Sequence, residues 1–525
     1  MPPPPPPLTL LLAVLVAGLQ TASAASSSQT GALLAFKRSL TIPPAAAAFF
    51  ATWDATAASP CNFTGVTCDS RRSVVIGLSV RERGVAAASV PFGIICGSLT
   101  NLTTLSLPSN ALAGGIDRVV ACTGLEELTL ASNAFSGAVP DLSPLTVLRR
   151  LDVSNNSFSG AFPWAALPAM PGLAVLAVGD NPFLEPTSSF PNEVTELTSL
   201  TVLYLSATNI AGAIPRGIGS LVKLVDLELA DNNLTGKIPS EIVNLVNLRT
   251  LHLYNSSLTG ALPRGFGKLT KLQYFDASEN MMSGGLSELR FLTRLVSLHI
   301  YWNGFSGEVP LEFGDFKELV YLSLYNNSLT GQLPQSLGTL SELTFIDVSM
   351  NSLTGPIPPD MCKSGRLLWI LLFENKFSGE IPATYERCTT LERFHVRRNS
   401  LSGEVPRGLW ALPNAVIIDL ADNHLTGGIG DGIGSARSLV SLSLGRNRFM
   451  GSIPSSIGNA RNLKILDLWS NKLSGNIPAS IGNARNLEYI DFSSNELSGA
   501  IPSSIGNARN LRNINLSSNK LSGML

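Results

Sequence analysis

The sequence is poor in the residues that most catalytic and metal sites need. Its 525 residues include only 4 histidines and 6 cysteines, and charged residues make up 14%. No H-E-x-x-H, G-x-S-x-G or protein-kinase signature occurs, so nothing indicates a metalloprotease, a serine hydrolase or a kinase. The net charge of −1 gives no reason to expect nucleic acid as a partner. We therefore expect no enzyme activity, no cofactor and no metal site.

Long apolar runs are also missing, except for one at the N-terminus. Residues 8–19 read LTLLLAVLVAGL and lead into TASA at residues 21–24, which is typical of a secretory signal peptide cleaved near Ala24. This run is shorter than the ~20 residues that a membrane-spanning helix needs. The sequence as it stands therefore predicts a signal peptide over residues 1–24 and a secreted mature chain.

Two further features fit passage through the secretory pathway. The six cysteines fall into close pairs, which predicts three local disulfides: Cys61–Cys68, Cys96–Cys122 and Cys362–Cys388. N-x-S/T sequons predict N-glycosylation at Asn62, Asn101, Asn155, Asn233, Asn255, Asn326 and Asn515.

The most regular feature is a repeat. The octapeptide SIGNARNL stands at residues 456–463, 480–487 and 504–511, at a spacing of 24 residues. Each copy leads into the frame L-x-x-L-x-L-x-x-N-x-L-x-G-x-I-P, which recurs along most of the chain from residue 73. The alternation L-x-L sends leucines to one face of a strand and the intervening residues to the other. The asparagine can bond backbone groups that the following turn leaves unpaired.

This frame is the leucine-rich repeat. It predicts an α/β leucine-rich repeat solenoid, a curved right-handed superhelix with a parallel β-sheet on its concave face. We count about 18–19 repeats over residues 73–525, the last of them incomplete and uncapped. SIGNARNL itself shows the register of the coils. We interpret it as a structural motif that lies away from the sheet face and is not a ligand site.

The ending L-S/T-G-x-I-P resembles the plant-specific class of leucine-rich repeat, and the N-terminus extends the resemblance. GALLAFKRSL at residues 31–40 and ATWDATAASPCNFTGVTC at residues 51–68 look like the cap of plant receptor-kinase ectodomains. The resemblance implies a helical, disulfide-bonded N-terminal cap over residues 25–72. Such a cap covers the apolar edge of the first coil.

The outward strand positions carry the most specific pattern. Exposed aromatic side chains in a row are the usual anchors of interfaces, and guanidinium groups bind carboxylates well. At these positions the sequence has a stripe of aromatic residues that ends in a basic cluster. The stripe and the cluster consist of Tyr204, Tyr254, Tyr274, Tyr301, Tyr321, Tyr325, Phe345, Trp369, Phe373, Arg393, His395 and Arg397. Together they predict a track for an extended peptide whose C-terminal carboxylate binds at the arginines. The alternative is that aromatics favour strands in any case and that the arginines form a solvated charge run.

The segment CTTLERFHVRRN at residues 388–399 resembles the receptor kinases of subfamily XI, the HAESA and HAIKU types. In that family an R-x-R pair on one strand receives the free C-terminus of a peptide hormone. Arg393 matches the first arginine, whereas His395 stands in place of the second. Because an imidazole is charged only in acid, the resemblance implies stronger carboxylate binding in an acidic cell wall. Arg397 lies two positions further on the same face.

Two other recurring features are weaker signs of chemistry. We expect the aspartates that recur on the strands to form a solvated ladder, a solvent-exposed row with one carboxylate on each strand, and not a catalytic pair. They are Asp152, Asp226, Asp276, Asp347, Asp419, Asp467 and Asp491. The glycines of IGDGIG at residues 429–434 occupy the repeat's own turn and do not indicate a phosphate site.

The resemblance implies the extracellular ligand-binding ectodomain of a plant receptor-like kinase, which senses a secreted peptide with a shorter leucine-rich repeat co-receptor. Members of the family continue into a C-terminal cap, a transmembrane helix and a kinase, whereas this sequence stops at Leu525. We expect the apoplast as its location, or the plasma membrane for a longer form. This ending is expected of a fragment or truncated form of such a receptor kinase. The alternatives are a degenerate gene copy, or a secreted binding protein that resembles polygalacturonase inhibitors or decoy receptors.

Overall fold

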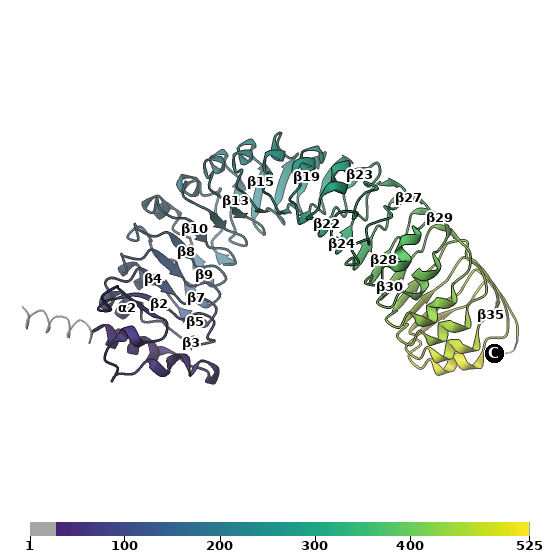
Figure 1. Ribbon diagram of the computed structural model, residues 1–525, viewed down its shortest axis with the longest axis horizontal. Coiled ribbons are helices and arrows are strands. Elements are labelled where there is room, and N and C mark those ends of the chain that lie inside the picture. Colours follow the sequence, from purple (N-terminus) through teal and green to yellow (C-terminus); the bar gives the residue numbers. More distant parts are fainter. Residues whose placement is uncertain (1–27, 524–525) are drawn as a thin grey trace, which may run out of the picture. The chain divides into compact units, whose positions relative to one another are not determined.

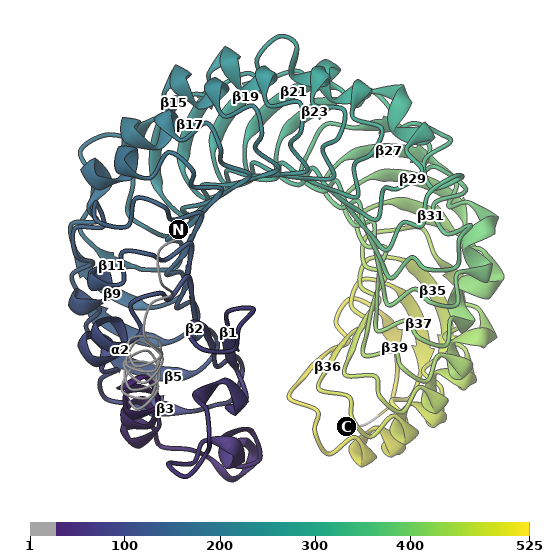
Figure 2. The ribbon, with the colours of Figure 1, turned by 60° about the vertical axis from the view of Figure 1, so that its left-hand side comes forward.

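The computed structural model describes residues 28–523, so the predicted signal peptide lies outside the described residues. The chain divides into two compact units at Leu248/Arg249. Within each unit, coils repeat a short strand, a turn and, in most coils, a 3-10 helix, and the short helices gather on a different side from the main strands (Figures 1 and 2). Over residues 28–523, no helix has the length and apolarity to cross a membrane.

The cap opens the first unit and has a core of aromatic rings. Trp53 is 2% exposed and stacks on Phe63, with ring centroids 5.3 Å apart, while Lys37 Nζ donates to the carbonyl oxygen of Trp53 at 2.7 Å. The Cys61–Cys68 disulfide closes the cap. Its elements are a helix over 28–39, η1 (Pro44–Ala46), η2 (Phe49–Thr52), η3 (Pro60–Asn62) and β1 (Val66–Cys68), which pairs antiparallel with β2 (Val75–Ser79).

The main sheet of the first unit is parallel beyond β1. After β2 it contains β4 (Thr104–Ser106), β6 (Glu127–Thr129), β8 (Arg150–Asp152), β10 (Val175–Ala177), β12 (Val202–Tyr204) and β14 (Asp226–Glu228). Shorter strands follow the turns: β3 (Ala86–Ala87), β5 (Ala111–Gly114), β7 (Ala134–Gly137), β9 (Ser157–Gly160), β11 (Phe183–Leu184), β13 (Ala211–Ala213) and β15 (Asn233–Lys237). The helices are α2 (Phe92–Ser98), η4 (Asp117–Ala121), η5 (Trp164–Ala169), η6 (Asn192–Glu196), η7 (Arg216–Ser220) and η8 (Ser240–Asn244).

The second unit repeats this plan with a parallel main sheet. Its strands are β16 (Thr250–His252), β18 (Tyr274–Asp276), β20 (Ser297–His299), β22 (Tyr321–Ser323), β24 (Phe345–Asp347), β26 (Trp369–Leu371), β28 (Arg393–His395), β30 (Ile417–Asp419), β32 (Ser441–Ser443), β34 (Ile465–Asp467), β36 (Tyr489–Asp491) and β38 (Asn513–Asn515). The shorter strands are β17 (Ser257–Gly260), β19 (Met281–Gly284), β21 (Gly304–Glu308), β23 (Ser328–Thr330), β25 (Thr354–Gly355), β27 (Lys376–Gly379), β29 (Ser400–Glu404), β31 (His424–Thr426), β33 (Met450–Gly451), β35 (Lys472–Asn476), β37 (Glu496–Gly499) and β39 (Lys520–Leu521).

The 3-10 helices of the second unit stand between the short strand and the next main strand. They are η9 (Phe266–Lys268), η10 (Ser287–Phe291), η11 (Leu311–Asp315), η12 (Ala383–Arg387), η13 (Arg407–Ala411), η14 (Asp431–Ser435), η15 (Ser455–Asn459), η16 (Ala479–Asn483) and η17 (Ser503–Asn507).

The typical main-sheet strand buries its middle residue and turns its two end residues outward. In β28, Phe394 is 1% exposed, Arg393 is exposed and His395 is half-buried. Phe394 pairs with Ile370 on one side and Ile418 on the other, so the middle residues form one continuous buried row. This confirms the leucine-rich repeat solenoid that the spacing predicts.

The repeat asparagines join each coil to the preceding one. Asn423 is 5% exposed, and its amide donates to the carbonyl oxygens of Val396, Leu420 and Ala421 at 3.0–3.1 Å. Its Oδ1 accepts the backbone N–H of Leu401 at 3.0 Å. Val396 and Leu401 belong to the coil before, so one side chain satisfies backbone groups of two coils.

The residue before each repeat asparagine adopts a conformation that the sequence frame does not show. The φ of Glu374, Arg398 and Asp422 is 53°, 53° and 55°, in the left-handed region that non-glycine residues seldom adopt. This residue turns the chain from the strand towards the core. The hydrogen bonds of the asparagine offset the strain of that turn.

We expect Asn423→Ala to lower the free energy of unfolding by about 2 kcal/mol, because it leaves buried carbonyl and N–H groups without a partner. Asn423→Thr should cost less, since Thr208 occupies the same place in its own repeat and donates to the Leu205 carbonyl at 2.6 Å. Urea unfolding followed by circular dichroism measures both. An equal decrease in the free energy of unfolding for the two variants would contradict the role of the Asn423 hydrogen bonds.

Candidate ligand-binding face

Outward side chains of the second unit form rows because its strands pair in register from β22 to β30. Figure 1 shows β22, β24, β28 and β30 following one another along this unit. We define three rows by these strands. The first row contains Tyr321, Phe345, Trp369 and Arg393. The second row contains Asp347, Leu371, His395 and Asp419. The third row lies two residues further along each coil and includes Tyr325, Phe373 and Arg397.

The first row ends in a guanidinium group held over an indole ring. Arg393 Cζ lies 4.2 Å from the centre of the Trp369 ring, and that ring lies 5.7 Å from the ring of Phe345. Trp369 Nε1 donates to Glu392 Oε2 at 3.2 Å, which fixes the indole. Among residues 28–523, none forms an ion pair or a side-chain hydrogen bond with Arg393. Its N–H groups are therefore available while the cation–π contact positions them.

His395 has a different environment from Arg393, although both face outward from β28. Its ring stacks on Phe373, with centroids 4.5 Å apart and planes at 26°. His395 Nε2 is buried and lies 2.9 Å from Asp419 Oδ2, close enough for an ion pair with that carboxylate. His395 is thus already engaged by a carboxylate of the protein itself.

Arg397 belongs to a cluster centred on one carboxylate. Arg397 Nε donates to Asp422 Oδ2 at 3.1 Å, and Arg446 Nε lies 3.3 Å from Asp422 Oδ1. Arg398 bridges Asp422 and Glu374, with its Nη1 2.6 Å from Glu374 Oε1. Three arginines therefore face two carboxylates, and the cluster keeps one excess positive charge. Unlike Arg393, Arg397 is engaged within the protein.

The predicted aromatic stripe is divided between the two units. In the second unit Tyr274 and Tyr321 are each 43% exposed, whereas the Tyr325 ring packs 6.2 Å from that of Phe373. The hydroxyl of Tyr301 donates to Glu279 Oε1 at 3.3 Å, and Tyr254 lies in the same outward position two repeats before it. Burial, above all, raises the pKa of Tyr301.

Tyr204 is the stripe residue of the first unit. Its hydroxyl donates to Asp180 Oδ2, and its ring covers the Cα of Gly179 so closely that a Cβ there would lie 2.6 Å from the ring. The structure therefore packs Tyr204 against its own coil. The other stripe residues, from Tyr254 to Phe373, belong to the unit that carries Arg393.

The strand aspartates of the second unit have a structural role that the sequence interpretation missed. Each accepts the backbone N–H two residues ahead at 2.9–3.3 Å: Asp276, Asp347, Asp419, Asp467 and Asp491. They are also half-buried, so they differ from the expected solvated ladder. The recurrent D-x-S triplets, as in DAS, DVS and DFS, were the signal in the sequence, because aspartate often bonds its own backbone two residues on.

Burial changes the pKa of two of these strand aspartates. It raises the pKa of Asp467 to about 6, helped by the negative charges of Asp491 and Asp419 and opposed by the Trp469 N–H and Arg397. Burial also raises the pKa of Asp347, against the effect of its hydrogen bonds from Ser349 and of His395.

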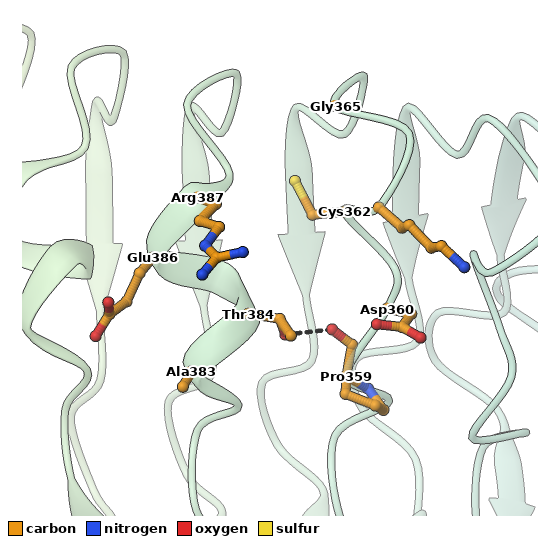
Figure 3. Close-up of a pocket in the computed structure, with 9 residues that line it drawn as sticks. Pro359, Asp360, Cys362, Gly365, Ala383, Thr384, Glu386 and Arg387 are labelled. Carbon is orange, nitrogen blue, oxygen red and sulfur yellow. Dashed lines mark hydrogen bonds between the residues drawn. The ribbon is translucent and has the colours of Figure 1, made fainter.

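No metal centre accompanies these rows within the described residues. No cluster of three or more His, Cys, Asp or Glu side chains there has the geometry to hold a metal ion. A hollow of about 540 Å³ lies on the helix side, beside Cys362, whose disulfide with Cys388 joins two coils. In Figure 3, Asp360 and Arg387 lie on opposite sides of Thr384, whose hydroxyl donates to a backbone carbonyl. These mixed charges favour no particular ligand.

Models of known families match several stretches of the chain. The N-terminal domain of leucine-rich repeat proteins matches residues 26–69, and a leucine-rich repeat region matches residues 154–311. Further leucine-rich repeat models match residues 461–521 and three shorter stretches, 318–340, 342–364 and 438–460.

Solved structures extend the likeness to almost the whole chain. The receptor kinase HAESA from Arabidopsis, in complex with the peptide hormone IDA and the co-receptor SERK1, is 34% identical with a TM-score of 0.84. The alignment covers 95% of this chain and 87% of that chain. The chain belongs to the leucine-rich repeat ectodomains of plant receptor-like kinases. This ectodomain is also similar to the plant peptide hormone receptor RGFR1 in complex with RGF2, at 29% identity, a TM-score of 0.74 and coverage of 88% and 84%.

Curated relatives of this ectodomain match over a shorter stretch. It is 46% identical over 163 residues to Receptor-like protein kinase 7, and 45% identical over 164 residues to Receptor-like protein kinase HAIKU2, both of Arabidopsis thaliana. The alignments span 31% and 30% of this chain and 16% of each relative. With the solved structures, they identify a ligand-binding ectodomain.

We expect Asp467→Asn to stabilise the ectodomain above pH 6, because it removes a half-buried negative charge that Asp491 and Asp419 repel. Below its folded-state pKa of about 6 the native carboxyl takes up a proton, while the unfolded chain does so only near its ordinary value of 3.8. The native protein therefore gains stability as the pH falls from about 6 towards 3.8, and the advantage of the variant shrinks.

Urea midpoints of the native protein and the variant across this pH range measure the effect. The exposed Asp431→Asn is the matched control and should change the midpoint little at any pH. A constant difference between native protein and Asp467→Asn at all pH values would contradict the assignment.

Proposed function

We propose that this ectodomain senses a secreted peptide, which it binds in an extended conformation on the outward face of the second unit's main sheet. The free C-terminal carboxylate of the peptide binds at Arg393, and the exposed rings of Tyr321 and Tyr274 contact the residues before it. A shorter leucine-rich repeat co-receptor then joins the complex, as SERK1 joins HAESA and IDA in the solved structure.

The observation that carries this proposal is the environment of the Arg393 side chain. It is exposed and lacks an acidic partner among the described residues, and Trp369 holds it in place at the end of an aromatic row. A fixed guanidinium group with free N–H groups matches a carboxylate, which it binds through two parallel hydrogen bonds. Because its orientation is set before binding, less conformational entropy is lost on binding.

The aromatic residues support the extended conformation of the ligand. Tyr274 and Tyr321 stand two strands apart in the register of the sheet and are each 43% exposed. Two exposed rings separated along one face fit an extended chain that crosses several strands, and large rings dominate the affinity of many interfaces. We propose that Phe345 and Trp369 form the floor between these rings and Arg393.

In this proposal, His395 and Arg397 have indirect roles. His395 lies between Phe373 and Asp419, so it fixes the Phe373 ring. Arg397 is held by Asp422, and its cluster contributes an excess positive charge beside the carboxylate site. Arg393 therefore carries most of the specific binding.

The proposal places the chain outside the cell, with residues 1–24 removed and residues 25–72 as the cap. The three disulfides fit that compartment, since such bonds persist where conditions are oxidising. The sequon residues Asn155 and Asn255 are exposed at the turn beside the main sheet, and we propose that they carry glycans there.

We expect Arg393→Ala to weaken peptide binding about tenfold or more, because it removes charge-assisted hydrogen bonds to the carboxylate. Calorimetry measures this with a peptide selected from a random library displayed with a free C-terminus, alongside IDA and RGF2 as starting probes. Arg407→Ala, an exposed arginine on η13, is the matched control and should bind as the native protein does.

Amidation of the peptide's C-terminus provides the decisive arm of this experiment. In the native protein, amidation should reduce the binding affinity as much as Arg393→Ala does. In the Arg393→Ala variant, amidation should reduce the affinity little further, because the two changes remove the same contact. If amidation weakens binding equally in both proteins, the carboxylate does not bind at Arg393. If no library peptide binds the native protein, the proposal of peptide sensing fails.

A further inference from the structure

One arginine recurs on four successive coils of the second unit, on the segment that leads into the strand. We call Arg437, Arg461, Arg485 and Arg509 the arginine row. Each is exposed, and within residues 28–523 none of the four forms an ion pair or a side-chain hydrogen bond. The row lies off the sheet face, so it is separate from the peptide site proposed above.

Packing explains Ile457, Gly458, Asn462 and Leu463 of SIGNARNL, but not the arginine side chains. Ile457 and Leu463 are buried in the core, and a Cβ on Gly458 would lie 2.1 Å from the carbonyl oxygen of Ser480 in the next coil. The Asn462 side chain donates to the Arg437 carbonyl at 2.7 Å, and Asn486 repeats this contact with the Arg461 carbonyl at 2.9 Å. The arginine side chains contribute to none of these contacts.

The close stacking of these coils leaves a polar hollow between arginines. It has a volume of about 600 Å³ and is lined by Gly458, Asn459, Arg461, Asn483, Arg485 and Asn486. Two guanidinium groups and three side-chain amides thus surround one open space. Such groups bind carboxylates and sugar hydroxyls respectively.

The surrounding charge on this side of the coils is positive. The segments 453–464, 477–488 and 501–512 contain five lysines and arginines and one acidic residue, Glu488, which pairs with Lys464 at 3.0 Å. The acidic residues of the same coils that face the sheet, Asp467 and Asp491, lie on the strands. The last repeats therefore separate a cationic side from an acidic sheet face.

We propose that the arginine row binds a linear acidic polysaccharide, a chain of uronic acid residues. One guanidinium group per coil calls for a ligand whose negative charge also repeats, since a single small anion would contact one or two arginines. The hollow between coils fits a narrow chain better than a flat membrane surface. Uronate carboxylates bind the arginines, and the amides of Asn459 and Asn483 bind neighbouring hydroxyl groups.

The test uses the whole chain and polygalacturonate as the probe. Replacing three members of the row together, Arg461→Gln, Arg485→Gln and Arg509→Gln, should weaken binding about tenfold or more, because several weak ion pairs act together. Binding to the native protein should also fall with added salt. Methyl-esterified polygalacturonate, which lacks the charges, should bind poorly.

The matched control removes the same number of positive charges from other places. It combines Arg264→Gln, Arg294→Gln and Arg407→Gln, at arginines that are exposed in the same unit. This control should bind polygalacturonate as the native protein does, and thermal unfolding checks that both triple variants remain folded. Unchanged binding in the arginine-row variant, or an equal loss in the control, would overturn the proposal. Equal binding of dextran sulfate and polygalacturonate would overturn its assignment to uronic acids.

Discussion

The structure depends on the way one asparagine side chain per coil satisfies backbone groups of two coils at once. Asn423 contacts three carbonyl oxygens and one N–H group, and most other repeats have the same arrangement. Without it, the turn after each strand would bury polar backbone groups that have no partner. The buried leucines contribute the larger share of the folding energy, but the asparagines fix where each coil turns and therefore which residues face outward.

This constraint separates the roles of the residues along each coil. The middle residue of the strand and the asparagine are determined by the fold, whereas the residues on either side of the strand centre are not. Arg393 and His395 flank the buried Phe394, and the fold would accept many other pairs in their place. A face of this kind can change its ligand without changing its core, because the two sets of residues hardly overlap. The aspartates are the exception, since they face outward and still bind their own backbone.

The sequence was sufficient to predict the solenoid, its parallel strands and the outward position of Arg393. These depend on a period, and a period is visible in one sequence. The contacts of Arg397 with Asp422 and of His395 with Asp419 were not predictable in the same way, because they join side chains one repeat apart through particular rotamers. The positive φ of Arg398 and Asp422 was hidden for another reason: the same backbone position accepts serine, tryptophan, methionine and glutamate in other repeats. The division of the stripe, with Tyr204 bound to Asp180 in the first unit, also depends on tertiary contacts.

The contact between Gly458 and Ser480 has a consequence for how such a chain changes over generations. Gly482 makes the same close approach to Ser504, so an identical coil stacks on an identical coil with no adjustment. The natural unit of insertion or deletion is then the whole coil of 24 residues, because both new junctions reproduce a junction that already exists. An unequal crossover within this region would lengthen or shorten the protein in steps and leave Arg393 and its neighbours untouched. The length of the chain and the residues of the face around Arg393 can therefore evolve independently.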